Sequence, residues 1–181
     1  MKLASIKRLY HGTDREFNTF DFKYARGFKD FGKGFYLTSN IGQAQKWAQR
    51  KARDKYVAYI YSYQLDFSGE KGWRILELLK YDQKWLDFIT KNRMEGEQTG
   101  DYDIIYDRIA DNQYTEISEV LRKYKQHKIS VEEAIRKISW KDNSRGDQYC
   151  FKTKRALTLL KEQAVFVLHK SKYGEWYQER R

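Results

Sequence analysis

The chain has 181 residues, which suits a single domain with its own hydrophobic core. With 40% hydrophobic and 17% aromatic residues, the composition excludes an intrinsically disordered protein, although 34% of the residues are charged. The net charge of +11, from 36 basic and 25 acidic residues, favours polyanionic partners such as nucleic acid, and also suits an anionic cofactor.

The first third of the chain combines short strands with one helix. A strand is predicted over 6–10, ending at a His-Gly-Thr turn, and the charged stretch 14–29 has no clear period and is predicted as a loop. After a short strand over 35–37, N-cap residues introduce a helix with Ile41 and three alanines on one face. Tyrosines at alternate positions predict a strand over 57–65.

The rest of the chain carries helices between shorter strands. Apolar residues at helical spacing predict helices over 82–92 and 117–124. Ser130 and Glu133 form a capping box, which predicts the start of another helix. Further strands are predicted over 103–106, 148–151 and 164–168.

These elements do not follow a regular βαβ alternation, so the pattern predicts an α+β fold. We expect one domain over 1–181, because neither a repeat nor a change in composition marks a linker. The helical stretch over about 82–139 is expected to be an insertion between core strands.

The sequence shows few features typical of a disulfide, a metal site or a membrane segment. The one cysteine, Cys150, cannot form an intramolecular disulfide and is predicted to be a buried small apolar residue. His127 and His169 lack partner ligands at metal-binding spacing, so we expect no metal. No apolar run is long enough for a secretion signal or a membrane span, which predicts a cytoplasmic protein without a membrane partner.

Two short segments carry the most specific signal. Residues 9–13 read LYHGT, and residues 31–38 read FGKGFYLT, with Trp47 eleven residues after Tyr36. Together they resemble the NAD-binding core of the ADP-ribosyltransferase superfamily, in the branch of diphtheria toxin and the poly(ADP-ribose) polymerases. More narrowly, the chain is similar to a bacterial ADP-ribosyltransferase-like family of largely unassigned function. The resemblance implies a split, mostly antiparallel β-sheet.

The resemblance also implies roles for individual residues. His11 would hydrogen-bond the adenosine ribose, Gly12 would offer its backbone to the nicotinamide carboxamide, and Thr13 would brace the turn. Tyr36 and Trp47 would clamp the nicotinamide by stacking. The residues implied to bind NAD are His11, Gly12, Thr13, Lys33, Gly34, Tyr36, Trp47 and Gln148. The alternative is a strand-end histidine bonded to backbone and two ordinary core aromatics.

Gln148 is the best match to the third catalytic position, after His11 and Tyr36. The family carries a glutamate there, on a late strand, which bonds the nicotinamide ribose. An amide oxygen keeps that bond but brings no negative charge, a loss of about 2–4 kcal/mol for the transition state. Asp147 would point to the opposite face of the strand and cannot replace it. The alternative is a strand residue that bonds only its neighbours.

Gln148 and its surroundings also restrict the reaction. Without the glutamate, elongation of a poly(ADP-ribose) chain is not expected. Arginine-modifying relatives carry Gln or Glu two positions earlier, where this chain has Gly146, which argues against an arginine acceptor. The segment 85–89 with Asn92 and Arg93 is a further similarity to the bacterial family, to which the sequence assigns no chemical role.

The resemblance therefore implies a bacterial NAD-dependent mono-ADP-ribosyltransferase, acting as the toxin of a toxin–antitoxin or conflict system. The positive charge favours nucleic acid over protein as the macromolecular acceptor, and an antitoxin protein would be a further partner. Two alternatives remain open: a non-catalytic sensor of NAD or ADP-ribose, which Gln148 suggests, and a basic nucleic-acid-binding module.

Overall fold

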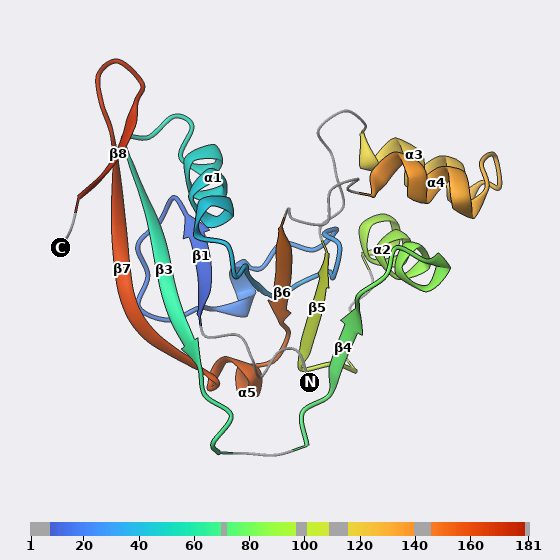
Figure 1. Cartoon of the computed structure of the whole chain (residues 1–181), viewed down its shortest axis with the longest axis horizontal. Helices are drawn as coiled ribbons and strands as arrows, with labels where there is room; N and C mark the ends of the chain where they lie inside the picture. Colours follow the sequence, from blue (N-terminus) through green and yellow to red (C-terminus); the bar gives the residue numbers. More distant parts are fainter. Residues whose placement is uncertain (1–7, 70–71, 97–100, 109–115, 140–145, 180–181) are drawn as a thin grey trace. The chain divides into compact units, whose positions relative to one another are not determined.

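The structure is a computed structural model that describes residues 8–69, 72–96, 101–108, 116–139 and 146–179 (Figure 1). The chain divides into two compact units, and each carries strands and helices. The first unit comprises Met1–Phe20, Tyr36–Gly72 and Lys154–Arg181. The second unit comprises Asp21–Phe35 and Trp73–Thr153. The two sheets are mostly antiparallel, which confirms the α+β class.

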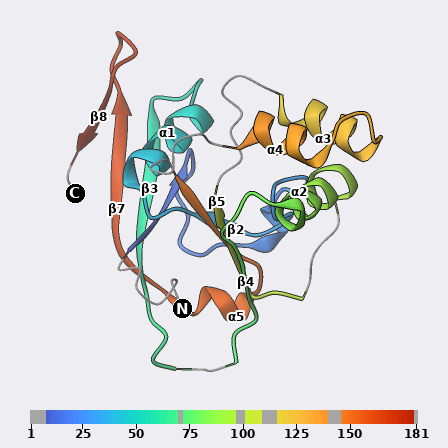
Figure 2. The ribbon, with the colours of Figure 1, turned by 45° about the vertical axis from the view of Figure 1, so that its right-hand side comes forward.

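The first unit is a four-stranded antiparallel sheet with the order β1-β3-β7-β8. Its strands are β1 (Leu9–Thr13), β3 (Val57–Leu65), β7 (Leu160–Lys170) and β8 (Trp176–Glu179). Figure 2 shows the long β3 and β7 side by side, with α1 (Ile41–Lys51) against the same sheet. A short helix, α5 (Lys154–Leu157), precedes β7.

Helix α1 forms because Asn40 caps its first turn and because its alanines leave room for close packing. The Asn40 side chain accepts a hydrogen bond from the backbone N–H of Gln43, 3.2 Å away. The core under the helix consists of small and branched side chains from α1, β3 and β7: Ala44, Ala48, Ala52, Ala58, Ile60 and Leu168. The alanine face of the helix is therefore the face that contacts the sheet.

The second unit holds the strands β4 (Ile75–Leu78), β5 (Ile104–Arg108) and β6 (Asp147–Phe151). They belong to a sheet with the order β2-β6-β5-β4, in which β4 and β5 are parallel and β5 and β6 antiparallel. Strand β2 (Phe35–Leu37) crosses the division between the units.

Three helices of the second unit pack against one another: α2 (Gln83–Glu95), α3 (Ile117–Lys125) and α4 (Val131–Ile138). Helix α2 is capped by Asp82 and buries Trp85, Leu86 and Ile89. A 3₁₀ turn, η2 (Phe22–Tyr24), lies in the loop before β2. The stretch expected to be a helical insertion thus also contains β5.

Most predicted elements are confirmed, with four corrections. The segment His-Gly-Thr is part of strand β1 rather than a turn, because its backbone pairs with β3 through Thr13. Ile41 is 40% exposed and does not join the alanine face. Strands β4 and β8 were not expected, and β7 is much longer than the predicted strand over 164–168. In the described part of the chain, no helix is both long and apolar enough to cross a membrane.

Candidate functional site

His11 joins the two segments that resemble the NAD-binding core. It lies on β1 and is half-buried, and its Nδ1 is 2.7 Å from the backbone oxygen of Tyr36 on β2. A carbonyl oxygen only accepts hydrogen bonds, so Nδ1 carries the proton. In the neutral ring Nε2 is then an acceptor.

Two aromatic residues that the sequence analysis did not single out support the imidazole. The ring of Phe17 meets that of His11 edge-on, with centroids 5.9 Å apart, and stacks on Tyr61 at 4.3 Å. The Phe17 N–H also donates to the Tyr61 hydroxyl, 2.8 Å away. Burial raises the pKa of Tyr61, so its hydroxyl stays neutral as an acceptor. The loop after β1 is thereby held against the His11 face of the sheet.

Gly12 presents its backbone at the edge of β1. Tyr10 exchanges two backbone hydrogen bonds with Thr38, of 2.7 and 2.9 Å. Backbone groups alternate in direction along a strand, so the N–H and C=O of Gly12 point toward the same edge. There the Lys51 ammonium donates to the Gly12 oxygen, 2.7 Å away.

Gly12 is a glycine because of helix α1. A Cβ at this position would lie 1.9 Å from the backbone oxygen of Ala44 and 2.9 Å from the backbone nitrogen of Ala48. Helix packing is therefore a sufficient reason for glycine at this position. Thr13 is buried, and its hydroxyl accepts a 3.3 Å bond from the Arg15 N–H at the end of the strand.

Tyr36 and Trp47 are both half-buried, the first on β2 and the second on α1. Among the described residues, no ring contact or hydrogen bond involves the Trp47 indole. The two rings are therefore not stacked on each other, and the expected nicotinamide clamp stays a prediction.

Lys33, Gly34 and Gln148 belong to the second unit. Lys33 is exposed, whereas Gly34 is buried under β6. A Cβ on Gly34 would lie 2.2 Å from Cys150 Sγ and 3.0 Å from the Phe151 oxygen, so only glycine allows this approach. Cys150 is fully buried, as predicted.

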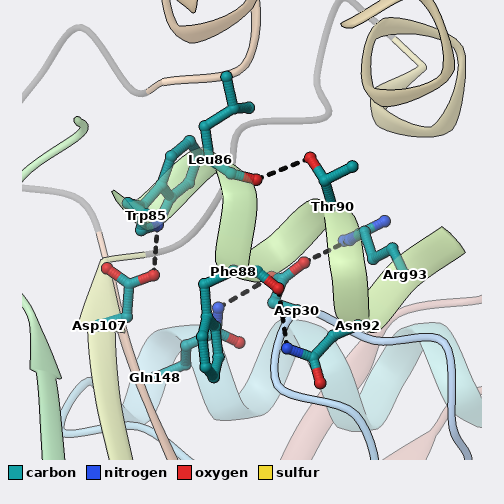
Figure 3. A network of polar contacts seen from close by, with 9 residues as sticks. All are labelled: Asp30, Trp85, Leu86, Phe88, Thr90, Asn92, Arg93, Asp107 and Gln148. Atoms are coloured by element: carbon teal, nitrogen blue, oxygen red, sulfur yellow. Dashed lines mark hydrogen bonds and ion pairs between the residues drawn. The ribbon is translucent and has the colours of Figure 1, made fainter. Parts of the chain in front are cut away.

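Gln148 takes part in a buried polar network (Figure 3). Its side chain is 5% exposed, and Nε2 donates to Asp30 Oδ2, 2.8 Å away. The other oxygen of the Asp30 carboxylate accepts from Nε of Arg93 on α2. Asp147 points to the opposite face, as predicted, because it accepts a 3.1 Å bond from the hydroxyl of Tyr149.

A second carboxylate flanks Gln148. Asp107 lies directly opposite Gln148 in the register of β5 and β6, so the two side chains share one face of the sheet. The Asp107 carboxylate is 1% exposed and accepts from Nε1 of Trp85 on α2 (Figure 3). Trp85 and Arg93, to which the sequence assigned no role, thus hold the two acids beside Gln148.

The basic residues of segments 50–55 and 122–137 are partly neutralised within each unit. The ion pairs are Arg53 with Asp54, Lys55 with Asp14, Lys123 with Glu119, Lys125 with Glu95 and Lys137 with Glu133. Arg50 and Arg122 are exposed and pair with no acid among the described residues. In the same part of the chain, no three His, Cys, Asp or Glu side chains are grouped to hold a metal.

Comparison with known proteins finds one family. A family model described as "Protein of unknown function (DUF3990)" matches residues 7–161, which include every residue of the two segments and Gln148. No curated protein and no solved structure matches the chain.

Proposed function

Because the chain belongs to the DUF3990 family, whose description assigns no activity, we propose a function from the site residues: a NAD-dependent mono-ADP-ribosyltransferase. The observation that carries the proposal is the hydrogen bond from His11 to the backbone of Tyr36. It joins the histidine and the tyrosine of the two segments that resemble the NAD-binding core. The proposed fold is accordingly the split sheet of that superfamily.

The groups of the first unit suit the chemistry of NAD. Breaking the bond between nicotinamide and ribose generates an oxocarbenium-like cation, so the enzyme must hold both fragments in place. We propose that the His11 ring bonds a ribose hydroxyl, and that the strand edge at Gly12 offers a donor and an acceptor to a carboxamide. The Gly12 oxygen has two lone pairs, so its bond to Lys51 leaves room for a second donor.

Gln148 of the second unit is proposed to bond the nicotinamide ribose through its amide oxygen. The missing carboxylate favours a single transfer, or hydrolysis of NAD, over chain elongation. Two buried acids, Asp30 and Asp107, flank the amide. We propose that the protein is the toxin of a toxin–antitoxin or conflict system, with an antitoxin as partner.

A NAD-binding sensor is the second candidate, favoured by glutamine at the third catalytic position. Two measurements separate the candidates. Thermal stabilisation by NAD without release of nicotinamide would identify a sensor, and release of nicotinamide a transferase. The absence of both would contradict the whole proposal and favour a basic nucleic-acid-binding module.

Substitutions of Trp47 test the proposed clamp. If the indole stacks on nicotinamide, Trp47→Phe should retain NAD turnover within about threefold, whereas Trp47→Ala should lose it on the order of tenfold. Steady-state release of nicotinamide measures both. Equal activity of the two variants would show that the ring does not contact NAD. Tyr56→Ala, an exposed aromatic of the same unit, is the matched control.

The acceptor is proposed to be nucleic acid, which predicts a dependence on salt. Neutralising the exposed Arg50, Arg53 and Arg122 should weaken binding of the acceptor and lower the slope of log K against log salt by up to about three. Turnover of NAD should not change. Lys51 is left intact because it bonds the Gly12 oxygen.

Labelled NAD added to a cell lysate identifies the acceptor directly. Label on nucleic acid is removed by nuclease, and label on protein is removed by protease. A matched triple variant, with glutamine at the exposed Lys23, Lys161 and Lys172, controls for net charge alone. If the label is on protein, and if the two triple variants change the labelling equally, the acceptor is protein rather than nucleic acid.

A further inference from the structure

We propose that Asp30, held by Arg93, is the positioning residue that orients the amide of Gln148 for ligand binding. The inference rests on the proposed function, since it takes Gln148 to be the contact to the nicotinamide ribose. It gives roles to a loop residue and a helix residue that neither the resemblance nor the family description assigns.

The orientation follows from what a carboxylate can do. Asp30 Oδ2 lies 2.8 Å from the Gln148 amide, and an ionised carboxylate only accepts hydrogen bonds. The NH₂ end of the amide therefore faces Asp30, and Oε1 points away from it (Figure 3). No hydrogen bond from the described part of the chain reaches Oε1. Gln148 thus presents an acceptor, which is the group that a ribose hydroxyl needs.

Arg93 keeps Asp30 in the form that this requires. The Asp30 side chain is only 8% exposed, and burying a carboxylate is costly unless the charge is paired and hydrogen-bonded. Nε of Arg93 donates to Oδ1, so the charge is compensated while Oδ2 stays available to Gln148. The charge also polarises the amide, which makes its oxygen a stronger acceptor beside a developing cation.

Asp30→Asn should reverse the orientation of the Gln148 side-chain amide. Asparagine has one accepting and one donating end, and the Arg93 guanidinium takes the oxygen. The NH₂ group of the new asparagine then faces Gln148, which must turn Oε1 inward and present its own NH₂ group outward. We expect kcat for nicotinamide release to fall on the order of 10²-fold, with a smaller change in KM for NAD.

Gln148→Glu alone should not restore a full negative charge at position 148, because the carboxylate of Asp30 lies beside it. The new carboxylate would lie against Asp30 and on the same face of the sheet as Asp107, so it should share one proton with Asp30, which raises the pKa of the pair. While the two carboxyl groups share a proton, the outward oxygen of the substituted side chain keeps its position. Turnover should therefore be retained at low pH and decline as pH rises through that raised pKa.

The double variant Asp30→Asn with Gln148→Glu is the decisive member of the cycle. The asparagine NH₂ donates to the inner oxygen of the glutamate, and the outer oxygen is an ionised acceptor. We expect kcat at or above that of the original protein, with a weaker pH dependence than that of Gln148→Glu, because Asp107 is then the one acid of the two that still faces the new carboxylate. A double variant as inactive as Asp30→Asn would overturn the inference, as would an Asp30→Asn variant with unchanged kcat.

Asp103→Asn is the matched control. Asp103 is a buried acid of the same unit, paired with Arg74 and Thr153 rather than with Gln148. Asp103→Asn should lower the melting temperature as Asp30→Asn does, and it should leave kcat unchanged. An equal loss of kcat in both would show that Asp30 acts only through stability. If Asp30→Asn does not fold, the pH profile of Gln148→Glu and the activity of the double variant decide the matter.

An NMR measurement separates this inference from the proposed function. The side-chain NH₂ signals of Gln148 should be shifted downfield and exchange slowly with solvent, and Asp30→Asn should abolish both effects. Signals unaffected by Asp30→Asn would overturn the inference whether or not the protein is active. An original protein that neither releases nicotinamide nor is stabilised by NAD would contradict the proposed function instead.

Discussion

Replacing His11 or Tyr36 by alanine should lower kcat/KM for NAD by at least about 10²-fold while the first unit stays folded. The His11 ring is proposed to bond a ribose hydroxyl and the Tyr36 ring to stack on nicotinamide, so either loss misplaces the reacting bond. His11→Ala also removes the hydrogen bond to the Tyr36 backbone, which lowers stability by about 1 kcal/mol. Nicotinamide release and thermal unfolding with and without NAD measure both effects.

Two residues of the same unit serve as matched controls. His169→Ala removes another partnered histidine, which is 3.0 Å from Glu179, and Tyr177→Ala removes an exposed tyrosine. Both controls should keep the stabilisation by NAD. If His11→Ala and Tyr36→Ala keep it as well, neither residue contacts NAD.

Gly12→Ala is expected to destabilise the first unit by about 3 kcal/mol or more. The added Cβ would meet three backbone atoms of α1, the nearest of them 1.9 Å away, and backbone cannot turn aside as a side chain can. The helix must therefore move off β1, which also loosens the alanine core. Chemical denaturation followed by circular dichroism gives the free energy of unfolding.

Gly69→Ala is the control for this substitution, because nothing lies within 4 Å of the Cβ position at Gly69. It should change the free energy of unfolding by less than about 0.5 kcal/mol. A stable Gly12→Ala variant that only fails to bind NAD would show that Gly12 is needed for the ligand and not for helix packing.

Local pattern accounts for the elements that the sequence analysis located well. Alternating tyrosines predicted β3 over 57–65, and the capping residues Asn40 and Ser130 precede α1 and α4. Each of these signals acts within a few residues, so no knowledge of the tertiary structure is needed to interpret it.

The elements that were missed depend on distant partners. Lys161, Glu162 and Gln163, near the start of β7, are polar and exposed. They extend as a strand because β3 pairs with β7 as far as Leu65 and Leu160. Strand β8 likewise pairs only with β7. Ile41 matches the helical spacing of the alanines, yet it lies at the first position of α1 and remains exposed. Such features follow from pairing and position, not from local pattern.

The candidate site shows the same limit. The segments around His11 and Tyr36 are compact motifs, and their resemblance to a known family could be seen in the sequence. The network around Gln148 could not, because Asp30 lies 118 residues before Gln148 and 63 before Arg93. Neither sequence separation corresponds to the period of a helix or a strand. Asp30 lies in a loop beside Lys29, and no local pattern there indicates burial.

The length of those separations has a consequence for synthesis on the ribosome. A nascent chain that ends before residue 148 contains Asp30 and Arg93, which can pair, but it lacks the strand that carries the glutamine. Helices α1 and α2 carry their own N-caps, Asn40 and Asp82, so their first turns can form earlier. The proposed catalytic unit is therefore completed only when β6 has been made, so a nascent chain that stops before Gln148 would lack it however well its helices have folded.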